Sequence, residues 1–131
     1  MSYYFNKTIQ GDPAIGFDAV IDKVTAALKA EGFGVLTEID FSGTLKKKLE
    51  VEIPNYRILG ACNPQFAYKS YQQENKIGVM LPCNVIVQQV ENGIEVSAVD
   101  PIASMQGVGN KELEGIASEV QAKLKAVIDS L

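Results

Sequence analysis

Histidine is absent from the 131 residues of this chain, and this absence excludes several classes of chemistry. Without an imidazole, no serine–histidine or cysteine–histidine relay can activate a nucleophile. Zinc sites that depend on histidine ligands are excluded for the same reason. A metal ion would have to be held by carboxylates, water, thiolates or a second subunit.

Cysteine is scarce as well. The chain has two, Cys62 and Cys83, and an asparagine follows each of them. Two thiols cannot complete a four-thiolate zinc site within one chain. A structural disulfide between them is not expected in a reducing cytoplasm. The sequence therefore raises the question whether Cys62-Asn63 and Cys83-Asn84 form one site or two unrelated strand ends.

Long apolar runs and an excess of positive charge are also missing. No run approaches the length of a membrane-spanning helix, and the first residues, MSYYFNKTIQGD, lack the basic start and apolar core of a signal peptide. The formal net charge is −4, and the basic run Lys46 to Lys48 is followed by Glu50 and Glu52. Nucleic-acid binding needs a basic face. We expect a cytoplasmic protein that binds neither membranes nor nucleic acid.

The composition favours one folded domain. Hydrophobic residues make up 47% of the chain and charged residues 21%, which is enough apolar material for one sizeable core. No linker or low-complexity segment interrupts the chain. We therefore expect residues 1–131 to form a single domain.

Two segments have the periodicity of long amphipathic helices. One apolar stripe lies in residues 16–31 and ends before Gly32, at the position where a helix C-terminus prefers glycine. The second stripe follows Asn110, a favoured N-cap residue. The two stripes consist of Phe17, Val20, Ile21, Val24 and Leu28, and of Leu113, Ile116, Val120, Leu124, Val127 and Leu131.

Shorter elements lie between these helices. Asn63-Pro64 begins a short helix that ends near Asn75. Residues 41–51 predict another, capped by Asp40, Ser42 or Thr44, with Leu45 and Leu49 facing inward. Asn92-Gly93 predicts a tight hairpin between two strands. The segments with strand character are residues 2–10, 33–40, 55–62, 78–90 and 93–100.

The predicted order is β-α-β-β-β-β-α with two short extra helices. This order favours an α+β two-layer sandwich, in which two long helices cover one face of a mainly antiparallel sheet. The other face is open or pairs with a second subunit, and we expect a homodimer. Apolar candidates for this second face are Tyr4, Leu36, Leu59 and Val90.

Several blocks of the sequence resemble a known family. "EGFGVLTEIDF", "YRILGACNP", "GVMLPCNVIV" and "VSAVDP" are similar, in this order, to the blocks of the bacterial and archaeal family called domain of unknown function 302. The resemblance runs from about Phe17 to the end of the chain. It implies an α+β fold like that of the TATA-binding protein, and it implies no activity.

The resemblance also covers the cysteine segments and two later residues. The matching positions are Cys62, Asn63, Pro64, Pro82, Cys83, Asn84, Asp100 and Pro101. It further implies a histidine near Tyr68 in many members, and this chain has none there. A function that depends on that imidazole does not carry over.

The geometry of the cysteines depends on how their strands pair. Cys62 ends one strand and Cys83 lies near the start of the next, so the thiols converge if these strands are antiparallel neighbours. Cys62 precedes a helix N-terminus, which lowers a thiol pKa. Cys83 alternates with Val85 and Val87, which predicts a buried thiol. Asn84 is the member of the set that no turn or cap explains.

These residues leave three functions open. The first is a non-enzymatic module that binds a small ligand or ion near Cys62, Asn63, Cys83, Asn84 and Tyr68, with the two thiols as candidate metal ligands. The second is a thiol-dependent redox or transfer enzyme with Cys62 as nucleophile. The third is an interaction protein that uses its open sheet face. No cofactor is identified.

Two carboxylates are weaker candidates. Asp40 and Asp100 each follow a strand and are typical of caps or turns. They become candidate bases or metal ligands if both border the same cleft. Tyr68, Tyr71 and Phe66 are equally typical of the packed face or rim of a helix.

Overall fold

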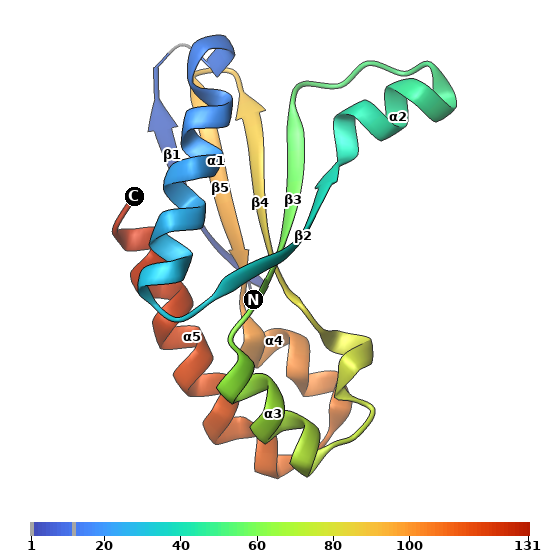
Figure 1. The fold of residues 1–131 in the computed structure, drawn as a ribbon, viewed down its shortest axis with the longest axis vertical. Coiled ribbons are helices and arrows are strands. Elements are labelled where there is room, and N and C mark those ends of the chain that lie inside the picture. The colour runs from blue at the N-terminus through green and yellow to red at the C-terminus, as the bar shows by residue number, and fades with distance from the viewer. Residues whose placement is uncertain (1, 12) are drawn as a thin grey trace.

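A five-stranded antiparallel sheet forms one layer of the computed structural model, which describes residues 2–11 and 13–131 (Figure 1). The spatial order of the strands is β1-β5-β4-β3-β2, so every neighbouring pair runs antiparallel. The strands are β1 (Tyr4–Gln10), β2 (Gly34–Asp40), β3 (Tyr56–Cys62), β4 (Cys83–Val90) and β5 (Gly93–Val99).

The long helices α1 (Pro13–Ala30) and α5 (Glu114–Asp129) cover one face of the sheet (Figure 1). The predicted α+β two-layer fold is confirmed. Three shorter helices lie at the ends of the sheet: α2 (Phe41–Leu49), α3 (Pro64–Gln73) and α4 (Pro101–Met105). Turns of 3₁₀ helix are η1 (Ile77–Met80), η2 (Gln106–Val108) and η3 (Lys111–Leu113). Of the residues described, none lies in a helix long and apolar enough to cross a membrane.

The core lies between the long helices and the covered sheet face. The α1 stripe is buried as predicted, and Val24 and Leu28 are fully buried. From α5, Leu124 is fully buried among the same residues. Alternation along the strands sends every second side chain into this layer. Sheet residues in the core are Leu59, Ala61, Val85, Val87, Ile94, Val96 and Ala98.

Several local predictions are confirmed. Asn63 caps α3 with Pro64 as its first residue, and Asp40 caps α2. Gly32 follows α1 with a φ of 86°, a conformation that glycine adopts without strain. The Asn92-Gly93 hairpin joins β4 to β5. Gly93 is needed there because a Cβ atom would clash with the Ile9 carbonyl oxygen of the neighbouring strand.

Three local predictions are wrong. Leu59 belongs to the core and not to the second face, because it pairs with Val85 on the covered side of the sheet. Leu49 does not face inward and is 65% exposed, because α2 projects away from the sheet (Figure 1). The fourth strand begins at Cys83 and not at residue 78, since Pro82 has no N–H for the ladder.

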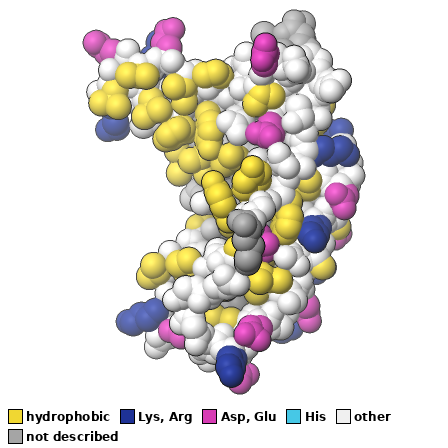
Figure 2. Space-filling model, turned by 180° about the vertical axis from the view of Figure 1, so that it is seen from behind, with side chains coloured by type: hydrophobic (Ala, Val, Ile, Leu, Met, Phe, Trp, Pro, Cys, Tyr) yellow, Lys and Arg dark blue, Asp and Glu magenta, His cyan; other side chains and the backbone are white. Residues whose placement is uncertain are grey.

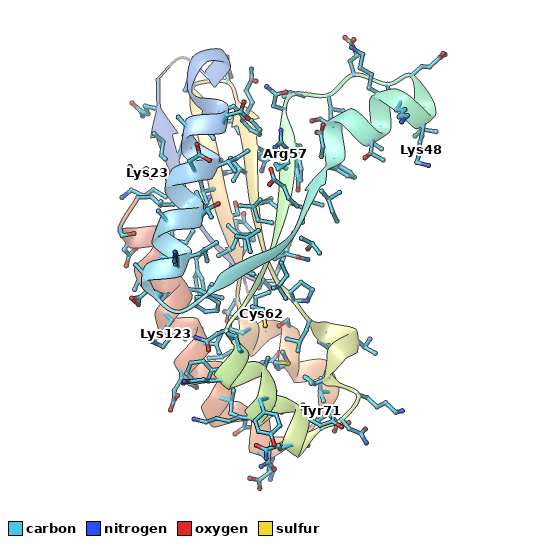
Figure 3. All side chains as sticks on the ribbon, in the orientation of Figure 1. Lys23, Lys48, Arg57, Cys62, Tyr71 and Lys123 are labelled. Atoms are coloured by element: carbon cyan, nitrogen blue, oxygen red, sulfur yellow. The ribbon has the colours of Figure 1, made fainter. Side chains whose placement is uncertain are left out.

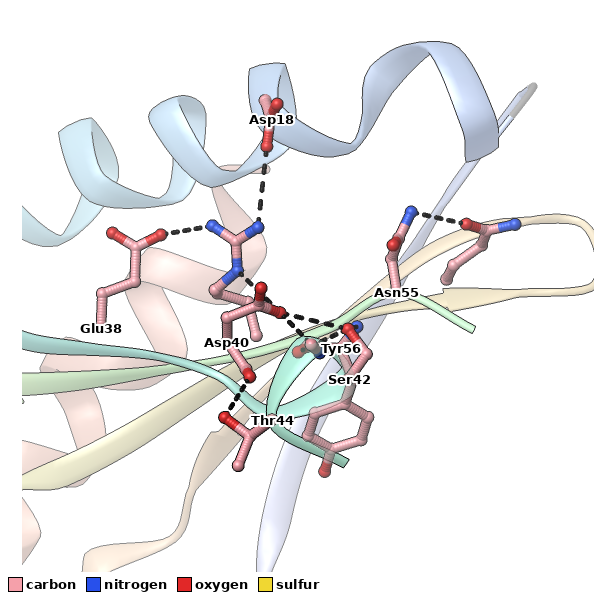
Figure 4. A network of polar contacts seen from close by, with 10 residues as sticks. Asp18, Glu38, Asp40, Ser42, Thr44, Asn55 and Tyr56 are labelled. Carbon is pink, nitrogen blue, oxygen red and sulfur yellow. Dashed lines mark hydrogen bonds and ion pairs between the residues drawn. The ribbon is translucent and has the colours of Figure 1, made fainter. Parts of the chain in front are cut away.

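A polar network around Arg57 holds the base of α2 (Figure 4). The Arg57 guanidinium lies 2.6 Å from Glu38, 3.9 Å from Asp40 and 4.0 Å from Asp18, so it connects β3 to β2 and α1. The Tyr56 amide donates to Ser42 Oγ at 3.0 Å. Asp40 accepts from the Gly43 amide at 3.0 Å. These contacts fix the direction in which α2 leaves the sheet.

Candidate functional site

A small cavity lies where the lower end of the sheet in Figure 1 meets α3, α4 and α5. Its volume is about 40 Å³, counted as space for the centres of water-sized molecules. The walls are mainly apolar, and Cys62 and Cys83 both line it. The remaining lining residues are Phe33, Ala61, Asn63, Phe66, Ala67, Ser70, Leu81, Pro82, Pro101, Met105, Leu113, Ala117 and Val120.

Strand pairing brings the two cysteines to this place. β3 and β4 are antiparallel neighbours, as predicted, with Ala61 opposite Cys83. Because neighbouring residues of a strand point to opposite faces, strict alternation would direct the Cys62 side chain to the open face, away from Ala61 and Cys83. The chain turns into α3 directly after Cys62 (Figure 3), however, and Cys62 lines the cavity together with Cys83. Both cysteines are half-buried free thiols.

The Cys83 thiol is held in its protonated form. Burial, with a smaller contribution from the charge interaction with Cys62, raises the pKa of Cys83 from 9.0 to about 11. A raised pKa means that, at neutral pH, Cys83 is almost wholly a neutral thiol. Because the thiolate is the nucleophile, Cys83 does not act as an attacking group at neutral pH without a partner that removes its proton.

This environment predicts an unusual pH profile for alkylation of Cys83. In the Cys62→Ser variant, the rate constant with iodoacetamide is expected to keep rising with pH beyond 9, because burial, the larger cause of the shift, remains. A short blocked peptide with one cysteine serves as the control, and its rate constant is expected to level off above the ordinary thiol pKa, about 8.5. Levelling of the Cys83 rate at the control's pH would contradict the buried environment.

Two polar side chains of the cavity make hydrogen bonds within α3. Asn63 Oδ1 accepts from the Phe66 amide at 3.5 Å as the cap of α3. The Ser70 hydroxyl donates to the Phe66 carbonyl at 2.8 Å. The soft donor atoms among the lining side chains are the sulfur atoms. In the described part of the chain, no three His, Cys, Asp or Glu residues are grouped to hold a metal ion.

Two members of the predicted set lie elsewhere. Asn84 follows Cys83 on β4 and lines the open face of the sheet, with Ile86 and Gln88. Tyr68 lies on α3, is 63% exposed and does not line the cavity. The structure thus brings together Cys62, Asn63 and Cys83, and it separates them from Asn84 and Tyr68.

Asp40 and Asp100 belong to separate networks and share no cleft. Asp40 caps α2 beside Arg57. Asp100 caps α4, where its Oδ1 accepts from the Ile102 amide at 3.0 Å and from Gln121 at 3.1 Å. Both carboxylates act as caps, which agrees with the turn and cap prediction made for them.

Met105 is the sulfur-bearing cavity residue that the sequence analysis missed. It ends α4, which has five residues and is too short to show a helical period. A usable signal was nevertheless present: Asp100-Pro101 repeats the cap-and-proline pattern that identified α3 at Asn63-Pro64. Asp100-Pro101 follows β5, which pairs with β4, and β4 begins at Cys83. A helix predicted to start at Pro101 would therefore have placed Met105 close to the Cys83 end of the sheet.

A second hollow, of about 420 Å³, lies on the open face of the sheet. Figure 2 shows this side from behind, hollowed and rich in hydrophobic side chains. Ile39, Ile58 and Ile86 are opposite one another on three neighbouring strands and form an apolar row across this face. Glu95 accepts hydrogen bonds from Asn6 at 2.8 Å and Gln88 at 3.0 Å, so these polar groups satisfy one another.

Comparisons with known proteins agree on the family. A family model described as "Domain of unknown function DUF302" matches residues 9–131. A crystal structure of an uncharacterized conserved DUF302 protein from Bacillus stearothermophilus is similar to this chain, with a TM-score of 0.88 and 24% sequence identity over 98% of each chain. This likeness shows the fold. No curated protein matches the chain.

Proposed function

The chain belongs to the DUF302 family, and we propose that it is a non-enzymatic binding module that holds a small ligand or ion in the two-thiol cavity. The observation that carries this proposal is the convergence of Cys62 and Cys83 on one small cavity at the ends of paired strands. Two free thiols are typical of a reducing compartment, which fits a cytoplasmic protein.

The size of the cavity limits the ligand. A buried water needs about 10–15 Å³ by this measure, so 40 Å³ accommodates a few atoms. Nucleotides and flavins are far too large. The ligand is therefore a single ion or a molecule of a few atoms, and it meets mainly apolar walls and sulfur.

The chemistry of the walls favours binding over catalysis. Among the described residues that line the cavity, none is Asp, Glu, Lys or Arg, so the lining offers no acid–base pair. Cys83 stays protonated at neutral pH because burial raises its pKa. The alternative, a thiol enzyme, draws support from Cys62, which directly precedes the capped N-terminus of α3.

We further propose that the protein acts as a homodimer through its open sheet face. The nine residues of α2 bury no side chain, and so short a helix is marginal in water unless a partner covers it. The apolar row of Ile39, Ile58 and Ile86 borders the same face. Three lysines of α2 complement the net negative charge of a second copy.

The binding proposal is tested by thermal unfolding with a panel of small probes: Cu(I) under anaerobic conditions, Zn²⁺, Cd²⁺ and xenon. A probe that occupies the cavity is expected to raise the midpoint, since ligand at 100 times its Kd stabilises by about 2.7 kcal/mol. The Ala117→Val variant narrows the cavity and is expected to lose the shift.

Ala122→Val is the matched control, because it makes the same change on the exposed side of α5. It is expected to keep the shift of the unmodified chain. The proposal fails if no probe raises the midpoint of the unmodified chain, or if Ala117→Val and Ala122→Val respond alike.

A further inference from the structure

We propose that the cavity ligand is a single Cu(I) ion, bound by the sulfur atoms of Cys62, Cys83 and Met105. This inference rests on the proposed binding function and names its ligand. It goes beyond the thiol pair because it adds a thioether from a different element of the fold.

Three sulfur-bearing side chains line one small space. Cys62 comes from the end of β3 (Figure 3), Cys83 from the start of β4, and Met105 from the end of α4. The chain has five sulfur atoms in all, from two cysteines and three methionines. Three of these five residues line one cavity of about 40 Å³, which points to a site for a soft ion.

The donor set selects among metal ions by softness. Mg²⁺ and Ca²⁺ require oxygen ligands, and the described lining residues include no carboxylate. Asn63 Oδ1 already accepts from the Phe66 amide, and the Ser70 hydroxyl already donates to the Phe66 carbonyl. Thiolate and thioether sulfurs remain, and these are the ligands that Cu(I) prefers.

The number of donors separates Cu(I) from zinc. Structural zinc sites are almost always four-coordinate, with Cys, His or carboxylate ligands. The cavity offers two thiols and a thioether, and thioether sulfur is not among the usual zinc ligands. Cu(I) is a soft ion that is satisfied with fewer ligands.

Charge and protons balance without a redox step. Each thiol that coordinates the ion releases its proton to solvent, and copper stays in the Cu(I) state throughout. Two thiolates with one Cu(I) carry one net negative charge. The bound ion therefore offsets one of the two negative charges that deprotonation places among mainly apolar walls.

The test is an anaerobic competition of the full chain against the chromophoric Cu(I) chelator bathocuproine disulfonate. We expect one Cu(I) per chain to be withheld from the chelator. Cys62→Ser and Cys83→Ser are expected to weaken the affinity at least about 100-fold, and Met105→Leu about tenfold. Met105→Leu conserves volume, so it removes the thioether while the packing remains.

Met80→Leu is the matched control, because Met80 lies outside the cavity lining. It should bind Cu(I) as the unmodified chain does. X-ray absorption at the copper edge should show a sulfur-only shell that loses one sulfur in Met105→Leu. Circular dichroism confirms that each variant is folded. Equal affinity in Met105→Leu and Met80→Leu would overturn the three-sulfur site.

The probe panel separates this inference from the proposed function. If Zn²⁺, Cd²⁺ or xenon raises the unfolding midpoint and Cu(I) does not, the cavity binds ligands but the copper assignment is wrong. If no probe has an effect, the binding function and the copper assignment fail together. Retention of Cu(I) by a chain that lacks both cysteines would show binding outside the cavity and would also overturn the inference.

Discussion

Replacing Leu124 by alanine is expected to lower the free energy of unfolding by about 3–5 kcal/mol. Leu124 lies on α5, is fully buried and belongs to the core that joins both long helices to the sheet. Truncation removes apolar contacts and leaves a cavity that the surrounding helices and strands cannot fill. Since whole domains are stable by about 5–15 kcal/mol, this one change removes a large share of the total.

Chemical denaturation monitored by circular dichroism measures this change. Glu119→Ala provides the control, because it truncates an exposed side chain on the same helix. Exposed positions usually alter stability by no more than about 0.5 kcal/mol. A loss below about 1 kcal/mol in Leu124→Ala would contradict the packing of α5 on the sheet.

Replacing Ile39 by lysine is expected to convert the proposed homodimer into a monomer. Ile39 is 48% exposed, lies on the edge strand β2 and starts the apolar row across the open face. A lysine there places a charge inside the proposed interface, where desolvation is costly. The same lysine is tolerated by the isolated chain, because edge strands often carry lysine facing solvent.

Light scattering after gel filtration gives the mass directly. We expect twice the chain mass of 14.2 kDa for the unmodified protein and the chain mass for Ile39→Lys. Ala26→Lys places the same charge on the exposed side of α1 and should leave the dimer intact. An unmodified chain that stays monomeric at high concentration ends the homodimer proposal.

The site was partly predictable from sequence. Asn63-Pro64 identified the start of α3, and the sequential strands on either side predicted that Cys62 and Cys83 converge. Both inferences rest on local rules: a cap and proline begin a helix, and consecutive strands pair. The register of β3 and β4, with Ala61 opposite Cys83, confirms the pairing.

Asn84 shows where local reasoning stopped. Sequence proximity joined it to Cys83, but neighbouring residues of a strand point to opposite faces. Asn84 therefore lines the open face, while Cys83 lines the cavity between the end of the sheet and helices α3, α4 and α5. Cys62 does not follow strict alternation. It lines the cavity because the chain leaves the sheet for α3 directly after it.

The amino-acid sequence by itself determined the strands, the long helices and the two-layer fold. Apolar stripes, caps, glycines and the Asn-Gly hairpin act over a few residues, so each element carries its own signal. Only the tertiary structure decided that α2 projects from the sheet and that Met105 lines the same cavity as Cys62 and Cys83. These outcomes depend on contacts between residues far apart in the chain, whose relative positions arise only when the core packs.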